Sequence, residues 1–205
     1  MASAAAGRVI TGYSYPMFVT RGGGAASADE IARGVDMSLT VETNDETVTF
    51  YANNGKAETV STGGEFVSGE ISLTVDGLLD GIIKKIFNVT SDIPSGATEA
   101  NGYMYKSNTK PNEVAYGCVV RTISGNNTQY YYIVLPRVKF DFPEDAAATQ
   151  EDTIDFQTTT LEGSFFEETD STSTYYQCWK YLSKEYDTEA ACKTALDTFL
   201  VTNFA

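Results

Sequence analysis

The chain has 205 residues, of which 42% are apolar, and its 28 acidic residues against 14 basic ones give a net charge of −14. These figures exclude an intrinsically disordered chain and argue against binding to nucleic acid through clustered Lys and Arg. The absence of histidine removes the commonest general base and a common zinc ligand. We therefore expect no enzyme, no cofactor and no metal site, and a negative potential along any channel that the protein lines.

The sequence shows few features typical of a membrane protein or of a disulfide-bonded protein. No apolar run has the length of a membrane span, and residues 1–7 do not resemble a signal peptide, so no membrane association is expected. Cys118, Cys178 and Cys192 are too few and too scattered for a metal knuckle or a disulfide framework. We expect free thiols in a reducing cytosol, with a bridge between Cys178 and Cys192 as the alternative.

The first part of the chain predicts strands. Residues 1–12 are expected to form a flexible arm and residues 13–19 a first strand. Residues 35–42 alternate strictly between apolar and polar side chains, which predicts a strand with one buried face. Residues 46–52 are expected to pair with that strand, before a turn at Asn53-Asn54-Gly55. We interpret residues 56–68 as a long loop or a loose hairpin.

A second alternating strand over residues 70–76 is expected to lead directly into a helix. Apolar residues recur at three- and four-residue spacing over residues 77–87, and Asp76 is positioned to cap this helix. The helix is too short to be stable alone, so it should pack on the sheet. Residues 90–111 are polar and predict a long loop.

The remainder of the chain predicts more strands and then a helical end. A hairpin is expected from residues 113–123 and 129–135, followed by strands over residues 138–142 and 152–166. Helical signals return over residues 175–205, with Asp187 as the N-cap. Taken together, we expect a single domain over residues 1–205: a mostly-β sandwich or barrel with one short helix packed on it and a helical C-terminal segment.

Six acidic residues share the polar parity of the predicted strands, and two interpretations of them stay open. They are Asp36, Glu42, Glu70, Asp76, Asp141 and Asp155. They form either an ordinary solvated sheet face or a face that lines an acidic channel, with Lys139 as the main opposing charge.

Two other groups of residues suggest chemistry less strongly. Tyr130–Tyr132, with Tyr103 and Tyr105, could form a sugar-binding platform. Tyrosine is also common in half-buried strands, and we favour that interpretation. We read the carboxylate pairs Glu144-Asp145 and Glu167-Glu168 as solvated charges, not as the acid and base of a glycosidase.

Four stretches of the chain resemble the major tail tube protein of long-tailed bacteriophages. They are residues 51–79 (YANNGKAETVSTGGEFVSGEISLTVDGLL), 32–39 (ARGVDMSL), 112–119 (NEVAYGCV) and 152–165 (DTIDFQTTTLEGSF). In that family a strand enters a YAD/N-N turn, a strand ending in L-x-V-D-x-L leads into a helix, and a late T-L-E-G strand is followed by Trp-Lys, as at Trp179-Lys180. The chain departs from the family at residues 90–111 and after Trp179.

The resemblance implies a structural protein, not an enzyme. It implies a β-sandwich flanked by a helix, six copies of which join their inner sheets into a ring, with rings stacked into a tail tube. The six acidic residues would then face a lumen that conducts double-stranded genomic DNA without binding it. The implied partners are other copies of the chain, the tape measure protein, the tail terminator and the tail-tip or baseplate proteins, in a virion tail assembled in the bacterial cytoplasm. A carbohydrate-binding or adhesin-like β-sandwich is the alternative.

Overall fold

The computed structural model of the chain describes residues 8–44, 47–52, 55–61, 63–89, 104–125, 127–144 and 158–205. The fold is mostly β and sandwich-like, as the sequence pattern predicts. Its elements in chain order are β1 Val9–Thr20, β2 Asp29–Glu30, β3 Gly34–Asn44, β4 Thr47–Ala52, β5 Gly55–Ser61, β6 Glu65–Val75, α1 Asp80–Phe87, β7 Val114–Ser124, β8 Asn127–Phe140, β9 Thr159–Phe166, β10 Tyr181–Leu182 and α2 Glu189–Phe204. No helix in the described part of the chain is long and apolar enough to cross a membrane.

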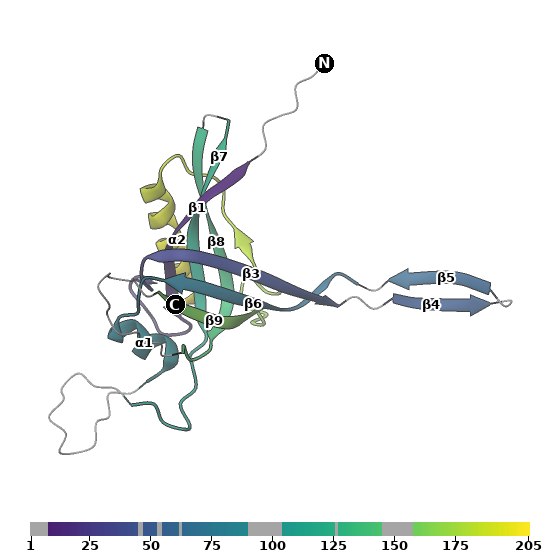
Figure 1. Cartoon of the computed structure of the whole chain (residues 1–205), viewed down its shortest axis with the longest axis horizontal. Helices are drawn as coiled ribbons and strands as arrows, with labels where there is room; N and C mark the ends of the chain where they lie inside the picture. Colours follow the sequence, from purple (N-terminus) through teal and green to yellow (C-terminus); the bar gives the residue numbers. More distant parts are fainter. Residues whose placement is uncertain are drawn as a thin grey trace, which may run out of the picture.

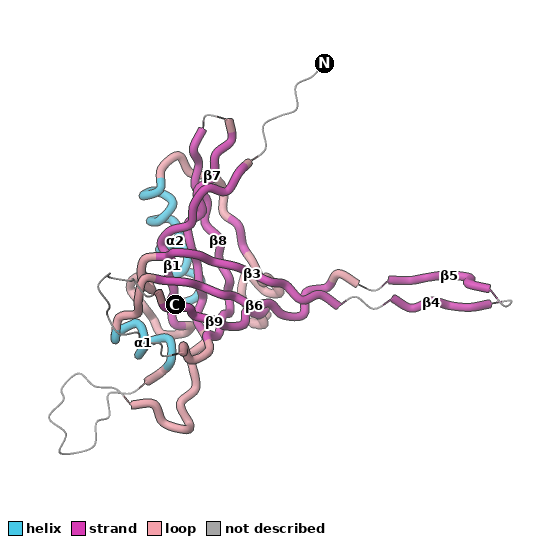
Figure 2. Tube along the Cα trace, viewed as in Figure 1, coloured by secondary structure: helices cyan, strands magenta, loops and turns pink. Residues whose placement is uncertain are grey.

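One antiparallel sheet supplies both layers of the sandwich. Its strand order is β2-β1-β7-β8-β9-β6-β3, and β10 pairs with β8 beside this path. The long strand β8 belongs to both layers, because its residues 127–135 pair with β7, its residues 137–140 pair with β9, and Val138 pairs with both. In Figure 1 the strands β1, β7 and β8 run across β3, β6 and β9, and Figure 2 shows the same arrangement in the plain trace.

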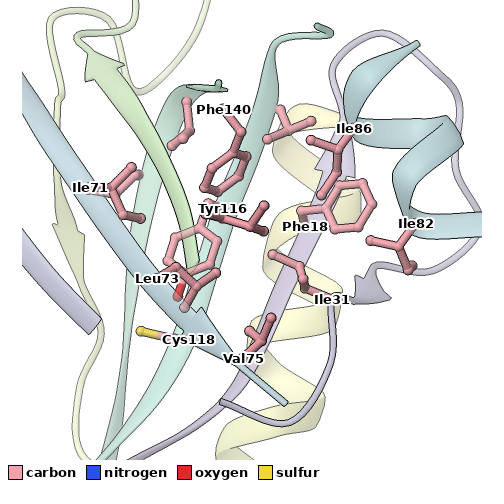
Figure 3. Packing of buried hydrophobic residues seen from close by; sticks show 14 of the residues in the cluster. Phe18, Ile31, Ile71, Leu73, Val75, Ile82, Ile86, Tyr116, Cys118 and Phe140 are labelled. Carbon is pink, nitrogen blue, oxygen red and sulfur yellow. The ribbon is translucent and has the colours of Figure 1, made fainter. Parts of the chain in front are cut away.

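The main core lies between the two layers. Alternation in β6 turns Ile71, Leu73 and Val75 inward, where each is at most 1% exposed. They meet Tyr116 of β7 and Phe140 of β8, both fully buried, and Figure 3 shows these side chains pointing toward one another. Each fully buried side chain of this size stabilises the fold by about 1.5–3 kcal/mol relative to exposure.

A second core covers the other face of β1, β7 and β8. Strand β7 is buried on both faces over residues 114–120, which explains why its sequence is almost continuously apolar. Helix α2 lies on this outer face and buries Cys192, Leu196, Leu200 and Phe204 against the sheet. The predicted C-terminal helix is therefore confirmed over residues 189–204, while residues 175–188 contain turns and β10 instead of helix.

Helix α1 closes one end of the main core, but it begins later than expected. Its N-cap is Leu79, which makes no side-chain cap, so the prediction that Asp76 caps this helix is wrong. The Asp76 carboxylate accepts hydrogen bonds from the backbone N–H and the Nε of Arg33 instead. At the other end of the helix, Asn112 donates from its backbone N–H to Ile86 O and from its side chain to Lys85 O, each at 2.8 Å.

Three expectations about the strands are corrected. Residues 47–52 do not pair with the strand at 35–42; β4 pairs with β5, and β3 pairs with β6 instead. The first strand begins at Val9, so residues 9–12, which were expected to form a flexible arm, belong to the sheet. The expected strands at residues 129–135 and 138–142 form one strand, because β8 continues through Pro136 to Phe140. Pro136 lies at a shift in register between β7 and β8, so the strand loses no ladder hydrogen bond through its missing N–H.

Candidate functional site

The four neighbouring strands β3, β6, β9 and the end of β8 present one continuous outward side. We call this side the polar face. Its members are Asp36, Ser38, Thr40, Glu42, Ser68, Glu70, Ser72, Thr74, Lys139, Thr160, Glu162 and Ser164. None of these residues is buried, and all of them are charged or carry a hydroxyl group.

The register aligns these side chains in rungs across the strands. Thr40 lies opposite Glu70, which lies opposite Ser164, which lies opposite Lys139. In the next rung, Ser38, Ser72 and Glu162 follow one another in the same way. Directly opposite residues have Cβ atoms about 4.5–5.5 Å apart, so within these two rungs each carboxylate lies directly opposite hydroxyl groups only.

Asp141 joins this face although it follows the end of β8. Its backbone N–H donates to Glu162 O at 2.8 Å. Asp141, Glu70 and Glu162 line one shallow depression of about 280 Å³ together with serine and threonine hydroxyls. Three carboxylates around a wet depression give this part of the surface a negative potential that repels anions.

Hydroxyl groups bridge some positions of the face. Ser68 Oγ donates to Glu42 Oε2 at 2.9 Å, across the β3–β6 pair. The Thr74 and Thr160 hydroxyls lie 3.4 Å apart across the β6–β9 pair. These contacts order the polar side chains without burying them.

The structure thus brings four of the six predicted acidic residues together: Asp36, Glu42, Glu70 and Asp141. Asp76 lies past the end of β6, where the hydrogen bond from Arg33 lowers the pKa of its carboxyl. Asp155 lies outside the described residues. Glu162 is an acidic member that the sequence reasoning missed, although the alternation of Thr160, Glu162 and Ser164 with buried Leu161 and Phe165 was a sufficient signal.

The tyrosines do not gather on one surface. Tyr131 packs into the main core, whereas Tyr132 and Tyr130 pack in the second core beside α2. Tyr105 lies elsewhere, with its ring edge-on to Phe142 at a centroid distance of 5.6 Å. Tyr103 lies outside the described residues.

The two carboxylate pairs differ in how far they are exposed to solvent. Glu144 is exposed and Asp145 lies outside the described residues. Glu168 is only 2% exposed, so the expectation that both members of Glu167-Glu168 are solvated is wrong. Its carboxylate accepts two hydrogen bonds from Arg21, at 2.7 and 3.0 Å. Burial alone would raise the pKa of the Glu168 carboxyl, but the hydrogen bonds from Arg21 and from Asp170 N–H outweigh it and lower that pKa.

All three cysteines are free thiols, as expected. Within the described residues, no group of three or more Cys, Asp or Glu side chains could hold a metal ion.

The chain matches no protein-family model and no curated protein sequence. The arrangement of the polar face therefore carries the functional argument.

Proposed function

We propose that the chain is a structural subunit of a phage tail tube, in which six copies form a ring and stacked rings enclose a lumen that conducts DNA. The observation that carries this proposal is the polar face: a four-stranded, unburied surface of hydroxyls with five carboxylates and one ammonium group, which are those of Asp36, Glu42, Glu70, Asp141, Glu162 and Lys139.

The chemistry of this face suits a surface over which DNA passes. A duplex carries one negative charge for about every 1.7 Å of its axis, and proteins hold it mainly by placing Lys and Arg on its phosphates. A face dominated by carboxylates repels those phosphates, while its hydroxyls keep the wall wetted. Such a wall lets a duplex move past it without sticking.

The open edge of the sheet supports assembly. Strand β3 is the last strand of the path and pairs only with β6 over the described residues. Its free N–H and C=O groups offer a template for a strand from another copy. At the other border of the polar face, Lys139 and Phe140 of β8 pair only with β9 among the described strands. Pairing of β3 from one copy with this border of the next copy would close the polar faces into one barrel.

The first experiment is electron microscopy of the purified protein after concentration and mild heating. We expect rings or hollow tubes with a central bore. A protein that remains monomeric under all these conditions would argue against the proposal.

A labelling experiment tests which face lines the bore. In Glu70→Cys, the new thiol should react with a maleimide carried on a large dextran in the monomer, but not in the assembled tube. The matched control is Leu182→Cys, because Leu182 of β10 is 54% exposed and β10 pairs in the other layer, beside α2. Its thiol should stay reactive in both states. Tubes in which the Glu70→Cys thiol remains fully reactive with the dextran reagent would contradict the assignment of the polar face.

A further inference from the structure

A small group of hydroxyl- and sulfur-containing side chains lies in and against the main core. We call it the Met37 cluster, and it consists of Met37 of β3, Tyr116 and Cys118 of β7, and Tyr13 of β1. Tyr116 O–H donates to Met37 Sδ at 3.4 Å, and Cys118 S–H donates to the same sulfur at 3.7 Å. The Tyr13 and Tyr116 hydroxyl oxygens lie 3.4 Å apart. The Met37 sulfur is thus the shared acceptor of two donors from the other layer of the sandwich.

The Met37 cluster links two strands that are not neighbours in the sheet. Strand β3 is the last strand of the path and, among the described strands, pairs only with β6. The contacts of Met37 with Tyr116 and Cys118 therefore join β3 to β7 through side chains alone. The Tyr13 ring adds to this link, because it lies directly over Gly34 at the start of β3 and leaves no room there for a Cβ. A chemical change at the Met37 sulfur would act on a strand that backbone hydrogen bonds hold on one side only.

The two sulfur atoms of the cluster differ in their reactivity. Cys118 is fully buried, whereas Met37 is half-buried, so part of the Met37 side chain is open to a small oxidant. A thiol reacts as its thiolate, and burial raises the pKa of the Cys118 thiol to about 12. A thioether needs no deprotonation before it is oxidised. Near pH 7, Met37 is therefore the reactive sulfur of the cluster.

Oxidation would change both the size and the polarity of the Met37 side chain. A sulfoxide is polar and chiral, and it carries one more heavy atom than the thioether. Tyr116 and Cys118 are fully buried where they contact the Met37 sulfur, and protein interiors are close-packed. The added oxygen therefore overpacks this part of the core. Because β3 is an edge strand, it is the element that can move to relieve the overpacking.

We propose that Met37 is a modification site for hydroperoxides, and that its oxidation releases β3 from β7. In this reaction the peroxide O–O bond breaks and a new S–O bond forms at Met37 Sδ. The thioether is oxidised to the sulfoxide, and the peroxide is reduced to water or to an alcohol. Methionine sulfoxide reductases reverse this modification, so the release of β3 is reversible. It is a property of the single chain and is independent of the proposed assembly.

The test begins with the natural protein and hydrogen peroxide at pH 7. Mass spectrometry of peptides should find one added oxygen on Met37. The midpoint of thermal unfolding should fall by about 2–12 °C, the range expected when a core of this size is overpacked. Hydrogen exchange should become faster at the β3 amides that pair with β6, and should stay unchanged in α2. Treatment with methionine sulfoxide reductases should restore the midpoint and the exchange rates.

Two variants assign the effect to one methionine. Met37→Leu keeps an apolar side chain of similar volume and lacks the sulfur, so its midpoint should not respond to peroxide. The matched control is Met104→Leu, because Met104 is 36% exposed and lies outside the buried clusters. The midpoint of Met104→Leu should fall on peroxide treatment as much as that of the natural protein.

Three outcomes would overturn the proposal. Oxidation of Met104 while Met37 stays unmodified in the folded protein would show that peroxide does not reach the cluster. Met37 sulfoxide with an unchanged midpoint and unchanged exchange in β3 would show that the strand is not released. Equal losses in the treated natural protein and the treated Met37→Leu variant would assign the effect to another residue. Because the reductase experiment uses the natural protein, the test does not depend on the folding of Met37→Leu.

Discussion

Arg21 and Glu168, 147 residues apart in the chain, meet in a two-pronged ion pair. Arg21 Nη1 lies 2.7 Å from Glu168 Oε2, and Arg21 Nη2 lies 3.0 Å from Oε1. Arg21 Nη1 also donates to Pro136 O at 2.9 Å. Because Arg21 follows β1, Pro136 lies in β8 and Glu168 follows β9, this pair ties the segment after β9 to both layers of the sandwich.

Arg21→Met should destabilise the protein by about 3 kcal/mol, because it leaves the buried Glu168 carboxylate without its cation. Urea unfolding at pH 7 measures this loss. The matched control is Arg33→Met, since Arg33 and Asp76 form an exposed pair, and such pairs contribute about 1 kcal/mol or less. Equal losses of unfolding free energy in the two variants would show that the burial of Glu168 does not strengthen its ion pair.

The same pair predicts a direction for the pH dependence. The pKa of the Glu168 carboxyl is lower in the folded state than its usual value. Its contribution to stability is therefore fully present above the unfolded-state pKa, about 4.3, and is lost as the pH falls through the folded-state pKa. The difference in unfolding free energy between the natural protein and Glu168→Gln should shrink in this acidic range. A difference that stays constant from pH 7 to pH 3 would contradict this account.

The parts of the fold that depend on local pattern were predictable from the sequence. The alternation over residues 35–42 and 70–76 marks β3 and β6, because a strand repeats every two residues whatever it pairs with. The same parity predicts that Asp36 and Glu70 lie on one face, as they do.

The parts that depend on distant partners were not predictable. Strand β3 pairs with β6 and not with the segment that follows it in the chain, because β4 and β5 form a two-stranded sheet of their own. The burial of Glu168 likewise depends on Arg21, which lies far away in the sequence. Periodicity carries no information about such long-range pairs, so the sequence indicated a solvated carboxylate.

Gly163→Ala should destabilise the protein by about 1–3 kcal/mol, because an added methyl group would overpack the sheet. A Cβ at Gly163 would lie 2.5 Å from Lys139 O and 2.9 Å from the Phe140 Cα, both backbone atoms that cannot rotate away. The control is Gly81→Ala in α1, where a Cβ meets nothing within 4 Å and alanine favours the helix by about 1 kcal/mol. Thermal unfolding of both variants should move the midpoint in opposite directions. Gly163→Ala with an unchanged midpoint would show that β8 and β9 can separate without cost.

The three thiols should differ in reactivity with a disulfide reagent such as DTNB. Cys118 and Cys192 are fully buried, and burial raises the pKa of each thiol to about 12. Cys178 is half-buried, so it should be the thiol that reacts in the folded protein, and slowly, because its pKa is also raised by burial. We expect about one slowly reacting equivalent per chain in buffer and three fast ones in denaturant, and Cys178→Ser should remove the native-state reaction. Rapid labelling of Cys192 in the folded Cys178→Ser variant would instead show that α2 detaches readily from the sheet.

Helix α2 begins one residue later than the sequence suggested, which leads to a test of its cap. The N-cap is Thr188, not Asp187, and Thr188 Oγ1 accepts a hydrogen bond from Ala191 N–H at 3.3 Å. Thr188→Ala should cost about 1 kcal/mol of stability, whereas Thr188→Ser should cost little, because serine supplies the same acceptor. Asp187→Ala is the matched control and should change stability by less than about 0.5 kcal/mol, as exposed substitutions usually do. A larger loss of unfolding free energy in Asp187→Ala than in Thr188→Ala, measured by urea unfolding, would show that Asp187 is the N-cap of α2.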